Sequence, residues 1–235
     1  MTRLAIWDFD GTLAQRRGET GWSRLLAEVL DSEEPGHPHS GETFRPHLRS
    51  GFPWHAPDVP HPELCAPGAW WGSIRPLLAR AYEAAGYPAA RAEELAAAAQ
   101  RLYVDPAVGW RLFDDVPPVL GRLRDEGWTH AILSNHVPEL RGIVSALGLD
   151  ELISVVVCSA ETGYEKPHPQ AFAALLDGIE AERVVMIGDN VVADVLGAEA
   201  VGIPALLVRR PDPRAARFVQ DLYGIEDVLE AEIAA

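Results

Sequence analysis

The chain is poor in cysteine, in basic residues and in long apolar runs. Cys65 and Cys158 are its only cysteines, so we expect no disulfide framework and a reducing, cytoplasmic setting. No apolar run approaches the roughly 18 residues that a transmembrane helix needs. The first residues lead directly into a strand-like segment and show no signal-peptide pattern. These absences exclude a disulfide-stapled secreted domain and predict no membrane partner.

The shortage of positive charge bears on the possible partners. The 235 residues include 20 Lys and Arg against 35 Asp and Glu, which gives a formal net charge of −15 at pH 7. Such a charge argues against binding nucleic acid or an anionic membrane. It also means that a site for a phosphate group needs local positive charge of its own. The oligomeric state is left open.

Strand-like and helix-like segments alternate along much of the chain. Strands are expected at residues 4–10, 128–133, 153–158, 184–187 and 204–208. Amphipathic helices are expected between the later strands, at residues 116–123, 138–147, 169–176 and 191–200. Because strands that alternate with helices pair in parallel, we expect an α/β fold with a Rossmann-like parallel sheet flanked by helices.

A different pattern interrupts this alternation between residues 15 and 111. Helical spacing is expected over residues 22–29, 69–85 and 88–103. Residues 31–68 are rich in Pro and His and predict a long irregular excursion. We therefore predict a discontinuous α/β core, residues 1–14 and 112–235, with an inserted all-helical cap over residues 15–111.

Two aspartates follow the first strand-like run, in the sequence Asp8-Phe9-Asp10-Gly11-Thr12. Side chains two residues apart at the end of a strand point the same way, so Asp8 and Asp10 are expected to converge. Two carboxylates held this close repel each other. The pair therefore predicts a bound cation, a shared proton or a reaction that uses both groups.

Further polar residues follow the later strands. They are Ser134 and Asn135, then Lys166, and finally Asp189 and Asp194. Ligands of open α/β sheets bind beyond the carboxyl ends of the strands, so this set is expected at one edge. It suits phosphoryl transfer, since a metal ion offsets the carboxylate charge and the lysine supplies positive charge for phosphate oxygens. Hydroxyl and backbone N–H groups can donate to the same oxygens, and an aspartate can form a covalent phosphate.

These motifs resemble those of the haloacid dehalogenase-like (HAD) hydrolase superfamily, in its phosphatase type with a helical cap. The resemblance implies that Asp8 is the nucleophile and Asp10 the general acid and base, with Mg²⁺ held by Asp8, Asp189 and the backbone carbonyl of Asp10. The implied phosphate ligands are Ser134 and Lys166, and Thr12 and Asn135 are further candidates. Asp194 would support the metal ligands and the lysine. The expected substrate is a small phosphorylated metabolite.

Alternative functions remain at this point. A phosphomutase would use the same intermediate, and a phosphorylated signalling domain or an inactive binding module would use the same residue types. The dehalogenases of the family lack an acid two residues after the nucleophile, so Asp10 favours a phosphatase. One position departs from the family pattern, because Ala193 stands where asparagine is frequent.

Several other residues draw attention without carrying a motif. The irregular spacing of His37, His39, His47, His55 and His61 does not match a zinc signature. His136 is a candidate for lining the site, and His168 is expected at a helix start. The aromatic residues Trp54, Trp70 and Trp71 are expected in the cap core, with an aromatic wall for substrate as the alternative. Arg209 and Arg210 are expected in a solvated turn.

Overall fold

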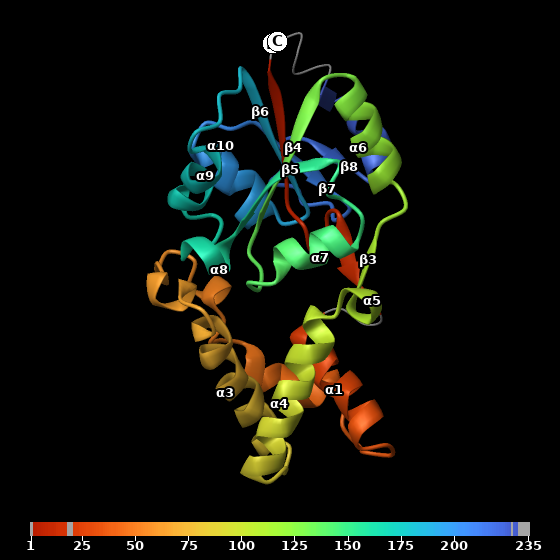
Figure 1. Ribbon diagram of the computed structural model, residues 1–235, viewed down its shortest axis with the longest axis vertical. Coiled ribbons are helices and arrows are strands. Elements are labelled where there is room, and N and C mark those ends of the chain that lie inside the picture. The colour runs from red at the N-terminus through yellow and green to blue at the C-terminus, as the bar shows by residue number, and fades with distance from the viewer. Residues whose placement is uncertain (1, 18–20, 227, 230–235) are drawn as a thin grey trace.

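The computed structural model describes residues 2–17, 21–226 and 228–229, and it divides into an α/β core and a helical part (Figure 1). The core holds a parallel sheet with the strand order β5-β4-β1-β6-β7-β8. Its strands are β1 Arg3–Trp7, β4 Trp128–Ser134, β5 Ile153–Cys158, β6 Arg183–Gly188, β7 Ala205–Val208 and β8 Phe218–Val219. The predicted Rossmann-like parallel sheet is confirmed.

Side chains of the central strand β1 alternate between two packed faces, as the two-residue repeat of a strand requires. Ala5 and Trp7 pack with α6 (Val116–Asp125) and α7 (Leu140–Ala146). Leu4 and Ile6 pack with the helices of the other face, which are α9 Pro169–Leu176, a π-helical turn over Val191–Leu196 and α10 Gly197–Ala200. The sheet is therefore buried on both faces, as parallel sheets are.

The helical part, called the cap from here on, contains α1 (Trp22–Glu33), α3 (Ala69–Ala84) and α4 (Ala89–Val104), which form the lower half of Figure 1. Residues 31–68 are not a featureless excursion. They hold the short helix α2 Gly41–Phe44 and 3₁₀ turns at Arg45–Leu48, Pro53–His55 and Pro62–Cys65. Within the described residues, no helix is both long and apolar enough to cross a membrane.

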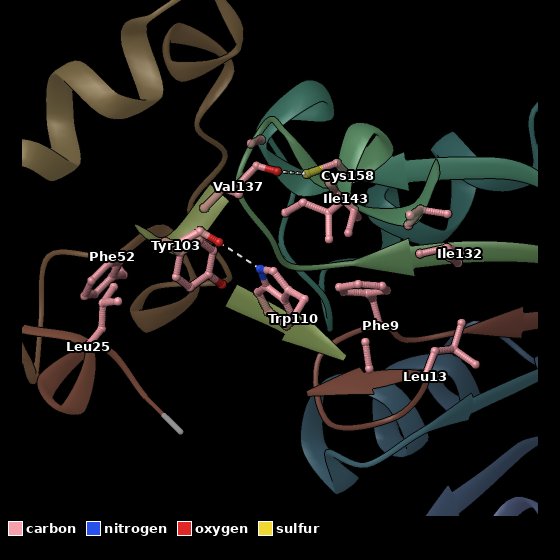
Figure 2. Close-up of a cluster of buried hydrophobic side chains, with 14 of the residues drawn as sticks. Phe9, Leu13, Leu25, Phe52, Tyr103, Trp110, Ile132, Val137, Ile143 and Cys158 are labelled. Atoms are coloured by element: carbon pink, nitrogen blue, oxygen red, sulfur yellow. Dashed lines mark hydrogen bonds between the residues drawn. The ribbon is translucent and has the colours of Figure 1, made fainter. Parts of the chain in front are cut away.

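A short antiparallel ribbon lies where the chain passes between core and cap. It pairs β2 (Ala14–Arg16) with β3 (Trp110–Leu112), just after α5 (Pro106–Gly109). Figure 2 shows that one buried cluster continues across this junction, from Phe9 through Trp110 and Tyr103 to Phe52. The indole N–H of Trp110 donates to the carbonyl of Tyr103 at 2.8 Å. Core and cap are thus packed against each other through aromatic side chains.

One local expectation was wrong. The first strand ends at Trp7, not at residue 10, because β1 pairs with β4 and β6 only as far as Trp7. The chain then turns back, with the N–H groups of Leu13 and Ala14 donating to the carbonyl of Phe9. After Pro211 the structure places β8, a 3₁₀ turn at Leu222–Gly224, and helical residues at 225–226 and 228–229. Residues 230–235 of that segment lie outside the described residues.

Candidate active site

The polar residues predicted at the strand ends line one cavity of about 350 Å³ between the core and the cap. From the core side come Asp8, Asp10, Ser134, Asn135, Lys166, Asp189 and Asp194. The loops after β1, β4, β5 and β6 carry these residues to a common edge, because the strands run parallel. Apart from Thr12, the structure therefore brings together every residue that the sequence placed in the site.

Lys166 forms the electrostatic centre of this group. Its ammonium nitrogen Nζ donates to Asp8 Oδ1 at 2.8 Å and to Asp194 Oδ1 at 2.7 Å, and only 2% of the residue is exposed. Burial opposes the charged form, but the two carboxylates outweigh it and raise the pKa of Lys166. The lysine therefore carries the local positive charge that a phosphate site in this acidic chain needs.

Asp8 is oriented by two donors on the same oxygen. Ser134 Oγ donates to Asp8 Oδ1 at 2.9 Å, beside the bond from Lys166. Both contacts fix the carboxylate plane while leaving Oδ2 to act on a ligand. Asp8 is buried, and it lies immediately beyond the last paired residue of β1, so its backbone is held by the sheet.

Asn135 and Asn190 hold the loops in place. Asn135 Nδ2 donates to the carbonyl of Lys166 at 2.8 Å, and the N–H of Lys166 donates to Asn135 Oδ1 at 2.7 Å. The N–H of Asn190 donates to Asp194 Oδ2 at 2.9 Å. Asn135 was predicted as a phosphate ligand; in the structure its amide bonds to both the N–H and the carbonyl of Lys166 and so positions the lysine.

A group of three carboxylates could hold a metal ion. Asp8, Asp189 and Asp194 each offer an oxygen within 4.8 Å of the others. Burial, together with the charges of Asp8 and Asp194, raises the pKa of Asp189 to about 7. The raised pKa indicates that the protein supplies too little positive charge around these carboxylates. Carboxylate oxygens are ligands that suit Mg²⁺. The residues present therefore fit a divalent cation.

Two glycines make room for these carboxylates. A side chain at Gly11 would collide with Asp189, and one at Gly188 would collide with Asp194. Gly11 also has a φ of +92°, a conformation that other residues rarely adopt. The glycine after Asp10 and the glycine before Asp189 are therefore required by the site itself.

Asp10 differs from the other carboxylates because it is exposed to the cavity. Protein atoms of the cavity walls nevertheless surround its carboxyl group and reduce its contact with bulk water. This loss of solvation and the charge of Asp8 raise the pKa of Asp10 to about 7. A carboxyl group with such a pKa can both give and take a proton near neutral pH.

Two residues lie elsewhere than the sequence suggested. Thr12 is fully buried, and it is not among the described residues that line the cavity. His136 is buried behind the site against Phe9 and Trp110, so it does not line the cavity either. His168, in contrast, is confirmed at a helix start, because its ring accepts from the N–H of Gln170.

The expectation of a solvated turn at Arg209 and Arg210 was wrong for Arg209. Its guanidinium pairs with both oxygens of Asp115 at 2.8 and 3.1 Å and stacks 3.6 Å from the ring centre of Phe113. Arg209 also donates to the carbonyl of Thr12 at 2.9 Å. Arg210 is exposed, but its Nη1 lies 3.2 Å from Asp189 Oδ2. The apolar strand before them gave no sign of these partners.

Sequence reasoning missed two aromatic residues that line the cavity from the cap. These residues are Trp22 and Tyr103, which line the cavity together with Trp54. Trp22 and Tyr103 sit on the apolar faces of α1 and α4, so their spacing indicated only helix packing. Of the tryptophans considered for the cap, Trp70 and Trp71 are buried in it and Trp54 reaches the cavity.

Comparison with known proteins identifies the family. A family model described as haloacid dehalogenase-like hydrolase matches residues 2–202, which include all the strand ends of the site and the cap. The chain belongs to the haloacid dehalogenase-like hydrolase family. The resemblance drawn from the four motifs is thereby confirmed, and so is the expectation of a hydrolase.

Individual relatives of this haloacid dehalogenase-like hydrolase include a phosphoserine phosphatase from Thermus thermophilus. It is 36% identical, over 91% of this chain and 93% of its own. A magnesium-bound HAD-hydrolase from Bacillus subtilis shares the fold, with a TM-score of 0.69, 18% identity, and coverage of 97% of this chain and 99% of its own. An L-2-haloacid dehalogenase from Xanthobacter autotrophicus has a TM-score of 0.67 and 19% identity, with coverage of 98% of this chain and 99% of its own. The sequence relative thus supports a phosphatase-type hydrolase, whereas the fold is common to both reactions.

Proposed function

We propose that the chain is a Mg²⁺-dependent phosphatase that hydrolyses a small phosphorylated metabolite through an aspartyl-phosphate on Asp8. One observation carries the proposal. Asp8 is held by Ser134 and Lys166 on one oxygen, and Asp10, a carboxyl group with its pKa near neutrality, opens onto the same cavity. This pairs a nucleophile with a proton carrier beside a phosphate-binding cation.

In the first half of the reaction, Asp8 Oδ2 attacks the phosphorus atom and the bond from phosphorus to the leaving oxygen breaks. Asp10 gives its proton to that oxygen, so the product leaves as an alcohol. Lys166 and Ser134 donate hydrogen bonds to the phosphoryl oxygens as charge spreads over them. A magnesium ion held by Asp8 and Asp189, with the Asp10 carbonyl, would offset the charge of the carboxylates and the phosphate.

In the second half, the Asp10 carboxylate takes a proton from a water molecule. The resulting hydroxide attacks phosphorus, the bond to Asp8 breaks, and inorganic phosphate is released. Asp10 is protonated again and Asp8 is free, so the cycle is balanced. Asp194 keeps Lys166 in place throughout, through the 2.7 Å ion pair between them.

The decisive experiment compares wild type, Asp8→Asn and Asp10→Asn on p-nitrophenyl phosphate, with Mg²⁺ and with EDTA. We expect Asp8→Asn and EDTA each to lower kcat by about a thousandfold. Asp10→Asn is expected to impair hydrolysis of an alkyl phosphate far more than that of p-nitrophenyl phosphate, because a nitrophenolate leaves without a proton. Equal rates in all samples would refute the proposal.

Two controls separate the alternatives. A phosphomutase would yield an isomer of a sugar phosphate without releasing phosphate, which ³¹P spectroscopy distinguishes. A dehalogenase would release halide from 2-chloropropionate. The exposed carboxyl of Asp10 in the cavity favours the phosphatase, since displacement of halide needs no proton for the leaving group.

A further inference from the structure

The cap side of the cavity has a chemistry unlike that of the core side. Trp22, Trp54, Pro57 and Tyr103 line it from the cap. On the core side the carboxylates, Ser134 and Lys166 cover the region where the proposed reaction takes place. The leaving group of a bound phosphate ester points away from the nucleophile, and so toward the cap. The cap side therefore decides which leaving groups fit.

The aromatic rings of the cap form a continuous series. Tyr103 stacks on Trp22 with 4.3 Å between ring centres and 12° between planes. Trp22 contacts Phe52 at 4.9 Å, and Phe52 stacks on Trp54 at 4.7 Å and 12°. These contacts hold each ring in place before a ligand arrives, so little conformational freedom is lost when another ring packs against them.

The core also contributes apolar atoms to the cavity lining. Val192 is 44% exposed, and it lines the cavity beside Ala193. Ala193 is also the position at which the sequence departs from the family pattern. A small apolar residue there widens the apolar surface instead of adding an amide. Apolar atoms therefore line the cavity from the core as well as from the cap.

Positive charge is scarce in the same place. Among the described residues that line the cavity, Lys166 is the sole cation, and Asp8 and Asp194 already pair with it. Arg210 is outside this lining and pairs with Asp189 at 3.2 Å. Four aspartates line the cavity as well. A leaving group with its own carboxylate or second phosphate would meet repulsion and find no free counter-charge.

We propose that the aromatic side chains of Trp22, Trp54 and Tyr103 select phosphate monoesters whose leaving group carries an uncharged aromatic ring. The inference rests on the proposed phosphatase function and names its substrate class. It separates this chain from its phosphoserine phosphatase relative, since the serine part of that relative's named substrate is small and charged. A cavity of about 350 Å³ accommodates a single ring beside the phosphate.

The first test compares 2-phenylethyl phosphate with ethyl phosphate in the wild-type protein with Mg²⁺. The two leaving alcohols have similar acidity, so a difference in kcat/KM reports recognition and not chemistry. We expect a preference of about tenfold for the aromatic ester, mainly through KM. O-phosphoserine is expected to rank with or below ethyl phosphate. A preference for ethyl phosphate or for O-phosphoserine would overturn the inference.

Variants assign the preference to the cavity-lining ring. Trp54→Ala is expected to reduce the preference about fivefold, whereas Trp54→Phe retains most of it. Trp70→Phe is the matched control, because Trp70 lies 6.2 Å from Trp54 between ring centres but is buried and does not line the cavity. It is expected to leave the preference unchanged. If Trp54→Ala lowers kcat/KM for both esters equally, the ring serves cap packing alone and the inference fails.

A binding measurement keeps this inference separate from the proposed function. Phosphonates cannot be hydrolysed at their carbon–phosphorus bond, so 2-phenylethylphosphonate and ethylphosphonate report affinity alone. Quenching of tryptophan fluorescence is expected to give about tenfold tighter binding of the aromatic phosphonate. If no ester is hydrolysed but this difference is found, the proposed function fails and the binding class stands. Equal affinities refute the inference even when the esters are hydrolysed.

Discussion

The core side of the cavity places polar groups at the ends of neighbouring strands, whereas the cap side places aromatic rings from three separate segments. Asp8, Ser134 and Asp189 each lie at or just beyond the end of a strand of one parallel sheet. Trp22 belongs to α1, Trp54 to a 3₁₀ turn and Tyr103 to α4. The core side therefore depends on sheet topology, and the cap side depends on how helices and turns pack.

The difference extends to the forces that hold each side. On the core side, buried charges stabilise one another, as in the contacts of Lys166 with Asp8 and Asp194. On the cap side, rings stack and bury apolar area. Loss of one charge leaves its partners buried without compensation, whereas loss of one ring leaves apolar neighbours that can partly repack. Four predictions test this contrast.

The largest effect is expected for Lys166→Met, which keeps the length of the side chain and removes its charge. Asp8 and Asp194 would then be buried without their cation, at a cost of about 3–5 kcal/mol in the free energy of unfolding. Activity on p-nitrophenyl phosphate is expected to fall by at least about a hundredfold. Urea unfolding and steady-state rates measure the two effects. Unchanged stability would show that the charges on the core side are not coupled.

The second prediction concerns Arg209, which ties the end of β7 to Asp115 at the start of α6 and to the carbonyl of Thr12. Arg209→Ala removes the paired hydrogen bonds to Asp115 and the contact with Phe113. We expect a loss of about 3 kcal/mol in the free energy of unfolding. Arg214→Ala is the control, because Arg214 pairs with Asp212 at the exposed surface, and it is expected to leave the unfolding midpoint unchanged. Equal effects of the two variants would contradict the prediction.

The third prediction is a pH dependence of stability that comes from the sheet and not from the site. Burial lowers the pKa of His130 to about 4. Trp7 Nε1 donates to His130 Nδ1 at 3.1 Å, and His130 Nε2 lies 2.9 Å from the carbonyl of Leu120, so the neutral ring satisfies both partners. In the unfolded chain a histidine has a pKa of about 6.5. Between these values the unfolded state binds more protons, so stability falls as the pH is lowered.

From pH 7 to pH 5 this histidine alone is expected to cost about 2 kcal/mol in the free energy of unfolding. His130→Gln cannot titrate in this range, and its amide can still accept from Trp7. The drop between pH 7 and pH 5, measured by urea unfolding, is therefore expected to be about 2 kcal/mol smaller in the variant. An identical drop in both proteins would show that His130 is not the titrating group.

The smallest effect is expected at the contact between cap and core. Trp71 Nε1 donates to both carboxylate oxygens of Glu139, at 2.9 and 3.0 Å. The neighbouring Trp70 has a buried Nε1 that lacks a hydrogen-bond partner among the described residues. Trp71→Phe is therefore expected to cost about 1 kcal/mol more stability than Trp70→Phe. Equal thermal shifts would indicate that the cap is held by ring packing without this hydrogen bond.

Much of the core side could be predicted because its causes are local. Apolar runs bounded by glycine and polar residues indicated the strands, and parallel pairing brings their carboxyl ends together. This was enough to select Asp8, Ser134, Lys166 and Asp189. The end of β1 was misplaced by three residues, since pairing with two neighbours, and not hydrophobicity, ends the strand at Trp7.

The residues that were missed depend on partners far away in the sequence. Arg209 meets Asp115 and Thr12 across 94 and 197 positions, and neither spacing leaves a local pattern. Trp22 and Tyr103 occupy apolar helix positions, and such positions are as consistent with packing inside the cap as with lining a cavity. Their contact with the cavity follows from the packing of α1 against α4 on the cap side of the site.

The sequence by itself determined the parallel sheet, the order of the motifs and the residue types at the strand ends, because strand and turn preferences act over a few neighbouring residues. Tertiary structure alone decided which ring faces the cavity, which arginine pairs with Asp115 and how far the pKa of Asp10 rises. Those properties arise from burial and from charges brought close in space. They exist only once the cap and the core have packed together.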